Sequence, residues 1–223
     1  MVHIVLDLEM NKLDKKYKEE RNICIREIIE IGAIALDDKF TEIGSFITLV
    51  KPEYNDVINP HIVDLTGIST EMVQDAPCFS QALGMFTDWV RNYNQEVSMY
   101  EWSDSDKEQL EKEIELKHVS GDDLLSIINW EWHDLQKEYG ELLGLERPIS
   151  LKQAIDYAGF DFEGRQHDAL FDARNTAYLL SLSRDENRFE KTMKNVLDAL
   201  KPKDIPCTLG SMFDFSKIML QGA

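Results

Sequence analysis

The stretch VHIVLDLEMN near the start of the chain places two acidic residues inside an otherwise apolar segment. Its aliphatic residues predict a buried strand over Val2–Met10, interrupted by Asp7 and Glu9. Because side chains at positions i and i+2 of a strand point to the same face, these two carboxylates should lie side by side. On a buried face they would repel each other, and burying them without a partner is costly. A divalent cation would remove that cost, since Mg²⁺ prefers carboxylate and water oxygens. The alternative is that this part of the strand reaches solvent and both groups are hydrated.

The remaining pattern predicts one α/β domain. Further strands are expected over residues 27–36, 40–52, 96–102 and 127–135, and helices over residues 79–93, 104–117, 135–145, 150–159, 167–182 and 187–200. Residues 53–77 are expected to form loops with short helical turns. This order of elements favours a mixed sheet with helices packed against it. We assign residues 1–200 to this domain and treat residues 201–223 as a C-terminal tail of unknown role.

The chain is strongly acidic, with 42 Asp and Glu residues against 24 Lys and Arg residues and a formal net charge of −18. Proteins that hold long nucleic acid usually carry a basic patch, so this balance argues against tight, nonspecific binding of a duplex. It is compatible with binding of metal cations and of a short strand end, because local electric fields decide such binding.

The cysteine pattern and the first residues predict a cytoplasmic protein without a membrane partner. Cys24, Cys78 and Cys207 are widely spaced and form no C-x-x-C pair, which is typical of free thiols in a reducing compartment. A zinc site is not expected, because His118 and His133 have no cysteine at ligand spacing. The start of the chain lacks the basic region of a signal peptide, and no window approaches the ~20 apolar residues of a membrane span.

Two later stretches add carboxylates and a histidine. In WSDSDKEQL, Asp104 and Asp106 follow the strand expected at 96–102, where an acidic residue is also a suitable helix N-cap. In GRQHDALFDARNTAYLL, we expect His167 in the loop before a helix, Asp168 at the N-cap, and Asp172 pointing inward from the second turn. Taken alone, this second stretch is also explained as a capped amphipathic helix with an apolar core face.

Together, these stretches resemble the three motifs of the DEDDh family of 3′→5′ exonucleases, within the ribonuclease H-like superfamily. The first motif is D-x-E in a strand, the second is Asp followed by an apolar residue four positions on, and the third is H-x-x-x-x-D. The matching residues are, in motif order, Asp7 with Glu9, Asp106 with Leu110, and His167 with Asp172. The family's usual continuation D-A-x-x-T-A is present as DARNTA, and HIVDLTGIST resembles its L-T-G-I segment. The resemblance covers about residues 2–183 and extends to the bacterial sporulation-inhibitor-like and polymerase III epsilon-like exonucleases and to the histone-mRNA and short-RNA exonuclease branch.

The resemblance implies a ribonuclease H-like mixed sheet flanked by helices, and an enzyme that hydrolyses single-stranded RNA or DNA from the 3′ end to nucleoside 5′-monophosphates. It also implies two Mg²⁺ or Mn²⁺ ions, a pair that stabilises both the attacking and the leaving oxygen of an in-line displacement. By this resemblance Asp7 would bridge both ions. Glu9 and Asp172 would complete the site of the ion that holds the water, and Asp106 would hold the second ion. His167 would be the general base, a role that a near-neutral pKa suits.

Some assignments have alternatives. Asp104 competes with Asp106 for the second motif, and Asp106 fits better because Leu110 lies four residues on. A sister group uses Tyr one position nearer the last Asp, but that position holds Asp168, so His167 is the better candidate. A nonhydrolytic nucleic-acid-binding or polymerase-associated module of the same fold, and a hydrolase of very short oligonucleotides, are the alternative functions.

The resemblance also places a pocket for the terminal nucleotide. Met10, Leu65, Thr66 and Gly67 would lie near its base and sugar, although a packed loop in which Gly67 permits a turn explains the same residues. Arg165 could contact a phosphate group, or it could be a solvated surface charge.

Overall fold

The computed structural model describes residues 1–200 and contains a mixed five-stranded sheet in the order β3-β2-β1-β4-β5. The strands are β1 (Val2–Lys12), β2 (Arg26–Leu36), β3 (Glu42–Leu49), β4 (Val97–Glu101) and β5 (Glu131–Asp134). Central β1 is antiparallel to β2 and parallel to β4, β3 is antiparallel to β2, and β5 is parallel to β4. The predicted mixed sheet is therefore confirmed, while residues 201–223, expected to form a tail, lie outside the described residues.

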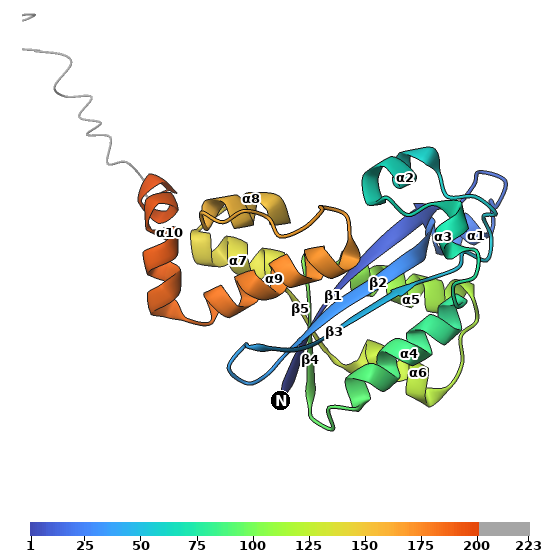
Figure 1. Ribbon diagram of the computed structural model, residues 1–223, viewed down its shortest axis with the longest axis horizontal. Coiled ribbons are helices and arrows are strands. Elements are labelled where there is room, and N and C mark those ends of the chain that lie inside the picture. The colour runs from blue at the N-terminus through green and yellow to red at the C-terminus, as the bar shows by residue number, and fades with distance from the viewer. Residues whose placement is uncertain (201–223) are drawn as a thin grey trace, which may run out of the picture.

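Helices cover both faces of this sheet (Figure 1). Those described are α1 (Glu20–Ile23), α2 (Pro60–Thr66), α3 (Thr70–Val73), α4 (Phe79–Arg91), α5 (Ser105–Leu116), α6 (Asp122–Asn129), α7 (Leu135–Leu143), α8 (Leu151–Tyr157), α9 (Ala169–Ser183) and α10 (Glu186–Leu200). Helices α4, α5 and α6 pack on one face, and α9 crosses the other, with α7, α8 and α10 beyond it. Within residues 1–200, no helix combines the length and the apolar character needed to cross a lipid bilayer.

The alternation of β1 directs its acidic residues to the α9 face. Ile4, Leu6 and Leu8 are buried in a cluster with residues of α4, α5 and α6. Val5, on the opposite face, is buried against Ala173 and other residues of α9. Since side chains alternate along a strand, Asp7 and Glu9 share the face of Val5. The prediction that both carboxylates project from one strand toward one face is therefore confirmed.

Helix α9 approaches the sheet closely because Gly32 of β2 has no side chain. A Cβ atom there would collide with the backbone of Ala169 and Leu170, at the first turn of α9. Gly32 is paired with Asp7 in the register of the sheet. The absence of a Cβ on β2 thus brings the N-terminus of α9 beside the acidic part of β1.

The predicted strand over residues 127–135 is wrong in its first part. Residues up to Asn129 belong to α6, and only Glu131–Asp134 form a strand. Ile127 is fully buried in the core that α6 shares with α4. A short apolar run such as LLSII is compatible with either a helix or a strand, and here packing against α4 selects the helix.

Candidate active site

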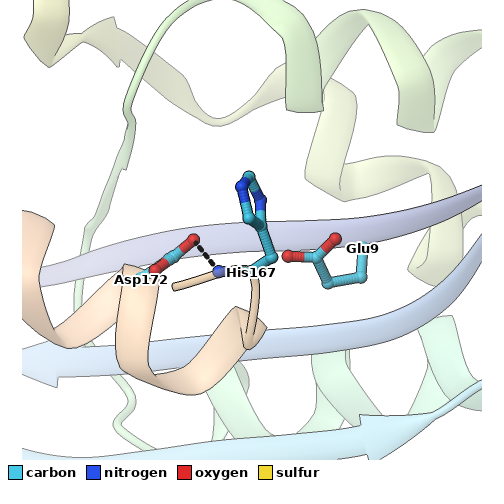
Figure 2. A group of neighbouring side chains, drawn as sticks. All are labelled: Glu9, His167 and Asp172. Atoms are coloured by element: carbon cyan, nitrogen blue, oxygen red, sulfur yellow. Dashed lines mark hydrogen bonds between the residues drawn. The ribbon is translucent and has the colours of Figure 1, made fainter. Parts of the chain in front are cut away.

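Glu9, His167 and Asp172 converge between β1 and the start of α9 (Figure 2). One potential ligand atom from each lies within 4.8 Å of the others, and this is the one such group of three or more found in residues 1–200. Glu9 and Asp172 are buried, whereas His167 is exposed. The arrangement therefore places two carboxylates beneath an imidazole that solvent can reach.

The start of α9 fixes this geometry. His167 lies in the turn before the helix with φ of +63°, and Asp168 is the N-cap, accepting a hydrogen bond from Phe171 N–H (3.1 Å). The backbone N–H of His167 donates to Oδ2 of Asp172 (3.1 Å). The predicted loop position of His167 and capping role of Asp168 are confirmed, although Asp172 lies in the first turn of α9, not the second.

Asp106 and Asp104 occupy different environments. Asp106 is buried in the first turn of α5, whereas Asp104 is exposed and makes no side-chain capping hydrogen bond. Glu101, at the end of β4, caps α5 instead: its Oε2 accepts the backbone N–H groups of Asp106 (3.0 Å) and Lys107 (2.8 Å). This capping holds the Asp106 backbone at the end of the sheet, and burial favours Asp106 over Asp104 as a site residue.

The carboxyl groups of the site raise one another's pKa. The pKa of Asp7 lies well above its usual value, first because of burial and then because of Asp106 and Asp172. Burial also raises the pKa of Asp106, and the charges of Glu101 and Glu9 add to the effect. These mutual effects show that the carboxylates form one electrostatic cluster, even though Asp7 and Asp106 are outside the 4.8 Å group described above.

Burial is also the main cause of the raised pKa values of Glu9 and Asp172. Burial, assisted by Asp172 and Glu30, raises the pKa of Glu9 to about 8. Burial raises the pKa of Asp172 to about 6, against the opposing hydrogen bond from His167 N–H. Partial desolvation and the charge of Arg165 lower the pKa of His167, which favours its neutral form.

The donor set fits divalent cations with a preference for oxygen. Oδ1 of Asp172 is buried and has no hydrogen-bond partner in the described chain. None of the ion pairs described for residues 1–200 involves Asp7, Glu9, Asp106 or Asp172. A buried, unpaired carboxylate oxygen beside further carboxylates is the environment that Mg²⁺ or Mn²⁺ would stabilise.

The residues expected to line the nucleotide pocket lie at two places. Leu65, Thr66 and Gly67 form the end of α2, where Gly67 is the C-cap with φ of +78°. Thr66 is buried, and its hydroxyl donates to the carbonyl of Ile62 (2.9 Å) and accepts from Ile68 N–H (3.1 Å). Its side chain is thus committed to the turn, while Leu65 and Gly67 are partly exposed.

Met10 is the remaining residue expected in that pocket. It is half-buried at the irregularity between Glu9 and the next pair of the β1–β2 ladder, and it packs against the core on the α4 side. Its side chain therefore leaves β1 on the other face from the carboxylates.

Sequence reasoning missed Glu30 and Glu101. Glu30 pairs with Glu9 across the β1–β2 ladder, and its Oε2 accepts the backbone N–H of Ala169 (3.0 Å) at the start of α9. Burial raises its pKa to about 7. The sequence contained an indication of Glu30, because it lies inside the apolar stretch EIIEIGAIAL just as Asp7 and Glu9 lie inside the apolar stretch of β1. The role of Glu101 could not be predicted from the sequence, because it depends on hydrogen bonds to the first turn of the following helix, α5.

The fold and this acidic cluster define an α/β protein of ribonuclease H-like architecture with a site suited to divalent cations. The chain belongs to the exonuclease family (RNase_T), which it matches over residues 4–180. The structure of the nuclease domain of 3′hExo, a DEDDh family member bound to rAMP, aligns with a TM-score of 0.70 at 23% identity, covering 83% of this chain and 92% of that one. Exonuclease I of E. coli in complex with a dT13 oligonucleotide aligns with a TM-score of 0.62 at 14% identity, covering 89% and 43%. The shared fold is therefore that of the nuclease domain of a DEDDh family member.

Curated relatives of similar sequence are named exoribonucleases. The ERI1 exoribonuclease 2 of Xenopus laevis is 30% identical over 177 residues, which cover 70% of this chain and 25% of the relative. The human 3′-5′ exoribonuclease 1 is 27% identical over 162 residues, covering 69% and 45%. The chain thus spans between a quarter and a half of the length of these relatives.

Proposed function

We propose that this chain is a metal-dependent 3′→5′ exonuclease that hydrolyses single-stranded nucleic acid to nucleoside 5′-monophosphates. The observation that supports this most directly is the convergence of Glu9 and Asp172 with the exposed His167. The proposal assigns the binding of two divalent cations, Mg²⁺ or Mn²⁺, to the carboxylates of Asp7, Glu9, Asp106 and Asp172. Such ions would supply Lewis-acid activation of a water and neutralise charge on the reacting phosphodiester.

The protein's own contribution is placement and proton transfer. Partial desolvation and the charge of Arg165 lower the pKa of His167, which favours the neutral imidazole that can accept a proton from the attacking water. Its backbone is held by Asp172, which aligns the turn with the carboxylate cluster. The Leu65–Gly67 segment at the end of α2 would contact the terminal base and sugar, whereas the Met10 side chain packs on the opposite face of β1.

RNA is the proposed first substrate, because the relatives are named exoribonucleases. One solved neighbour is described as recognising the 3′ end of a histone mRNA stem-loop, and another was determined with a DNA oligonucleotide. A 3′ end of single-stranded nucleic acid is therefore the proposed partner. Cys24 and Cys78 are free thiols, which favours a reducing cytoplasm as the compartment.

The test uses matched 5′-labelled single-stranded RNA and DNA with Mn²⁺, with Mg²⁺ and with chelator. We expect a ladder that shortens from the 3′ end, is lost with chelator, and is lost in Asp106→Asn but retained in the matched control Asp104→Asn. Retention of the ladder in chelator would contradict the metal-dependent mechanism. Binding of both oligonucleotides with no shortening would favour the nonhydrolytic module, and release of product from dinucleotides alone would favour a hydrolase of very short substrates.

A further inference from the structure

Arg165 links the turn that carries His167 to the end of α2. Its Nη2 atom donates hydrogen bonds to the carbonyl oxygens of Asp64 (2.8 Å) and Leu65 (3.0 Å), which lie 101 and 100 positions earlier in the chain. The last carbonyl groups of a helix have no partner within the helix and carry the negative end of its dipole. A guanidinium group is therefore a favourable partner for them, even at an exposed position.

Gly67 makes room for this contact. It has φ of +78°, a left-handed conformation that favours glycine, and it ends α2. A Cβ atom at this position would collide with Nη1 of Arg165. The guanidinium group therefore packs directly on the backbone of the segment expected to line the nucleotide pocket.

The rest of the turn is attached to α9. The side chain of Asn175 accepts from Glu163 N–H (3.0 Å) and donates to the Glu163 carbonyl (3.0 Å). A Cβ atom at Gly164 would collide with the ring of Phe171. Among the described hydrogen bonds of residues 163–168, those of Arg165 reach α2 and the others run within the turn and α9.

We propose that Arg165 is a positioning residue that makes the placement of the His167 imidazole depend on the position of the Leu65–Gly67 segment. The inference rests on the proposed function, in which this segment contacts the terminal nucleotide and His167 is the general base. In this role Arg165 acts through its two carbonyl hydrogen bonds and not on the substrate, in addition to the effect of its charge on the pKa of His167. A terminal nucleotide packed on the end of α2 thereby steadies the turn that carries the base.

The experiment measures kcat and KM separately, with a 5′-labelled single-stranded RNA and saturating Mn²⁺. We expect Arg165→Ala to lower kcat by about 10- to 100-fold, as small misplacements of a catalytic group do, with KM changed by less than about 3-fold. Arg165→Lys should give an intermediate kcat, because an ammonium group lacks the planar fork of donors.

Arg174 provides the matched control. It lies on α9 and forms ion pairs with Glu42 (3.3 Å) and Glu163 (3.5 Å), so it supports the same region without contacting α2. Arg174→Ala should change kcat by less than about 2-fold, because partly exposed ion pairs contribute little to stability.

A double-mutant cycle tests the contact itself. Gly67→Ala strains the left-handed backbone and also displaces the Arg165 guanidinium group, so it should lower kcat in the wild-type background, and the part of that loss that acts through Arg165 should be absent in the Arg165→Ala background. Full additivity of the two losses would overturn the coupling.

The kinetic pattern distinguishes the remaining outcomes. An increase in KM with unchanged kcat in Arg165→Ala would show that the guanidinium contacts a substrate phosphate, and an unchanged kcat and KM would show that it has no role. Both results, in an active wild-type protein, overturn this inference alone. A folded wild type that is inactive with Mn²⁺ and with Mg²⁺ would overturn the proposed function and this inference with it.

Discussion

Two groups of mostly buried acidic residues lie beside the central strands, and they differ in how their charge is balanced. In the first, Lys117 Nζ lies 2.7 Å from Glu113 Oε1 and 3.2 Å from Glu27 Oε1, and all three side chains are at most 3% exposed. Backbone N–H groups of residues 53–55 and of Ile28 donate further hydrogen bonds to these two carboxylates. We call this group the lysine cluster. Its two carboxylates have a cation, Lys117, within the chain itself.

The second group, the site cluster, consists of Asp7, Glu9, Glu30, Asp106 and Asp172. It has no ion pair among those described for residues 1–200, and it contains the unpartnered oxygen of Asp172. Burial raises the pKa of all five carboxyl groups, and the charges of other members of the cluster add to this effect for Asp7, Glu9 and Asp106. Under the proposed function, buried acidity in this fold is stabilised by a lysine where its role is structural, and would be stabilised by an external cation where its role is chemical.

The largest effect should come from removing a carboxylate of the site cluster. Asp7→Asn should lower kcat/KM by more than about 100-fold. This is a larger loss than the mutation of a residue that only supports a metal ligand causes. Its thermal unfolding temperature in chelator should equal or exceed that of the wild type, because one repelling charge is gone. An activity close to that of the wild type in the ladder assay would remove Asp7 from the site.

Removing the cation of the lysine cluster should lower stability strongly and change activity little. Lys117→Met leaves Glu27 and Glu113 buried without a countercharge, which should lower the free energy of unfolding by about 3–5 kcal/mol. Chemical denaturation measures this loss. Activity per folded molecule at low temperature should stay within about 3-fold of the wild type, and a selective loss of activity with unchanged stability would break the comparison.

The next largest effect should be the pH dependence of the stabilisation of the protein by metal ions. The folded pKa values of Glu9 (about 8), Glu30 (about 7) and Asp172 (about 6) all exceed those of the unfolded chain. Without metal the folded state therefore binds more protons than the unfolded state, and its stability falls as pH rises from about 4 to 8. Cations replace those protons, so the increase in unfolding temperature caused by Mn²⁺ should be larger at pH 8 than at pH 6. Calorimetry that shows the same increase at both values would contradict the assignment.

The smallest effect should come from Glu30, which belongs to the site cluster but caps α9. Glu30→Gln keeps an acceptor for Ala169 N–H and removes a charge, so activity should stay within about 3-fold and stability in chelator at pH 8 should rise. Glu30→Leu leaves that buried N–H without a partner and should cost about 1–3 kcal/mol. Denaturation of the two variants, compared in chelator, separates the capping role from the charge, and equal stabilities would show that the cap is unimportant.

The sequence predicted the features that depend on local periodicity and capping. The strand over Val2–Met10, the shared face of Asp7 and Glu9, and the loop position of His167 follow from spacing along a few residues. These local features were enough to place the central strand and the start of α9.

The features that escaped prediction join distant parts of the chain. The hydrogen bond from Ala169 to Glu30 spans 139 residues, and that from Arg165 to Asp64 spans 101. Neither segment alone specifies its partner. The helical part of residues 122–129 was likewise decided by packing against α4 and not by its own apolar pattern.

Calorimetric titration of Mn²⁺ into the metal-free protein at pH 7.5 tests most directly whether the site cluster is built for an external cation. We predict saturable binding that Asp7→Asn weakens strongly and Lys117→Met leaves intact at a temperature where that variant is folded. Binding that is absent from the folded wild type, or that persists unchanged in Asp7→Asn, would contradict this interpretation of the structure.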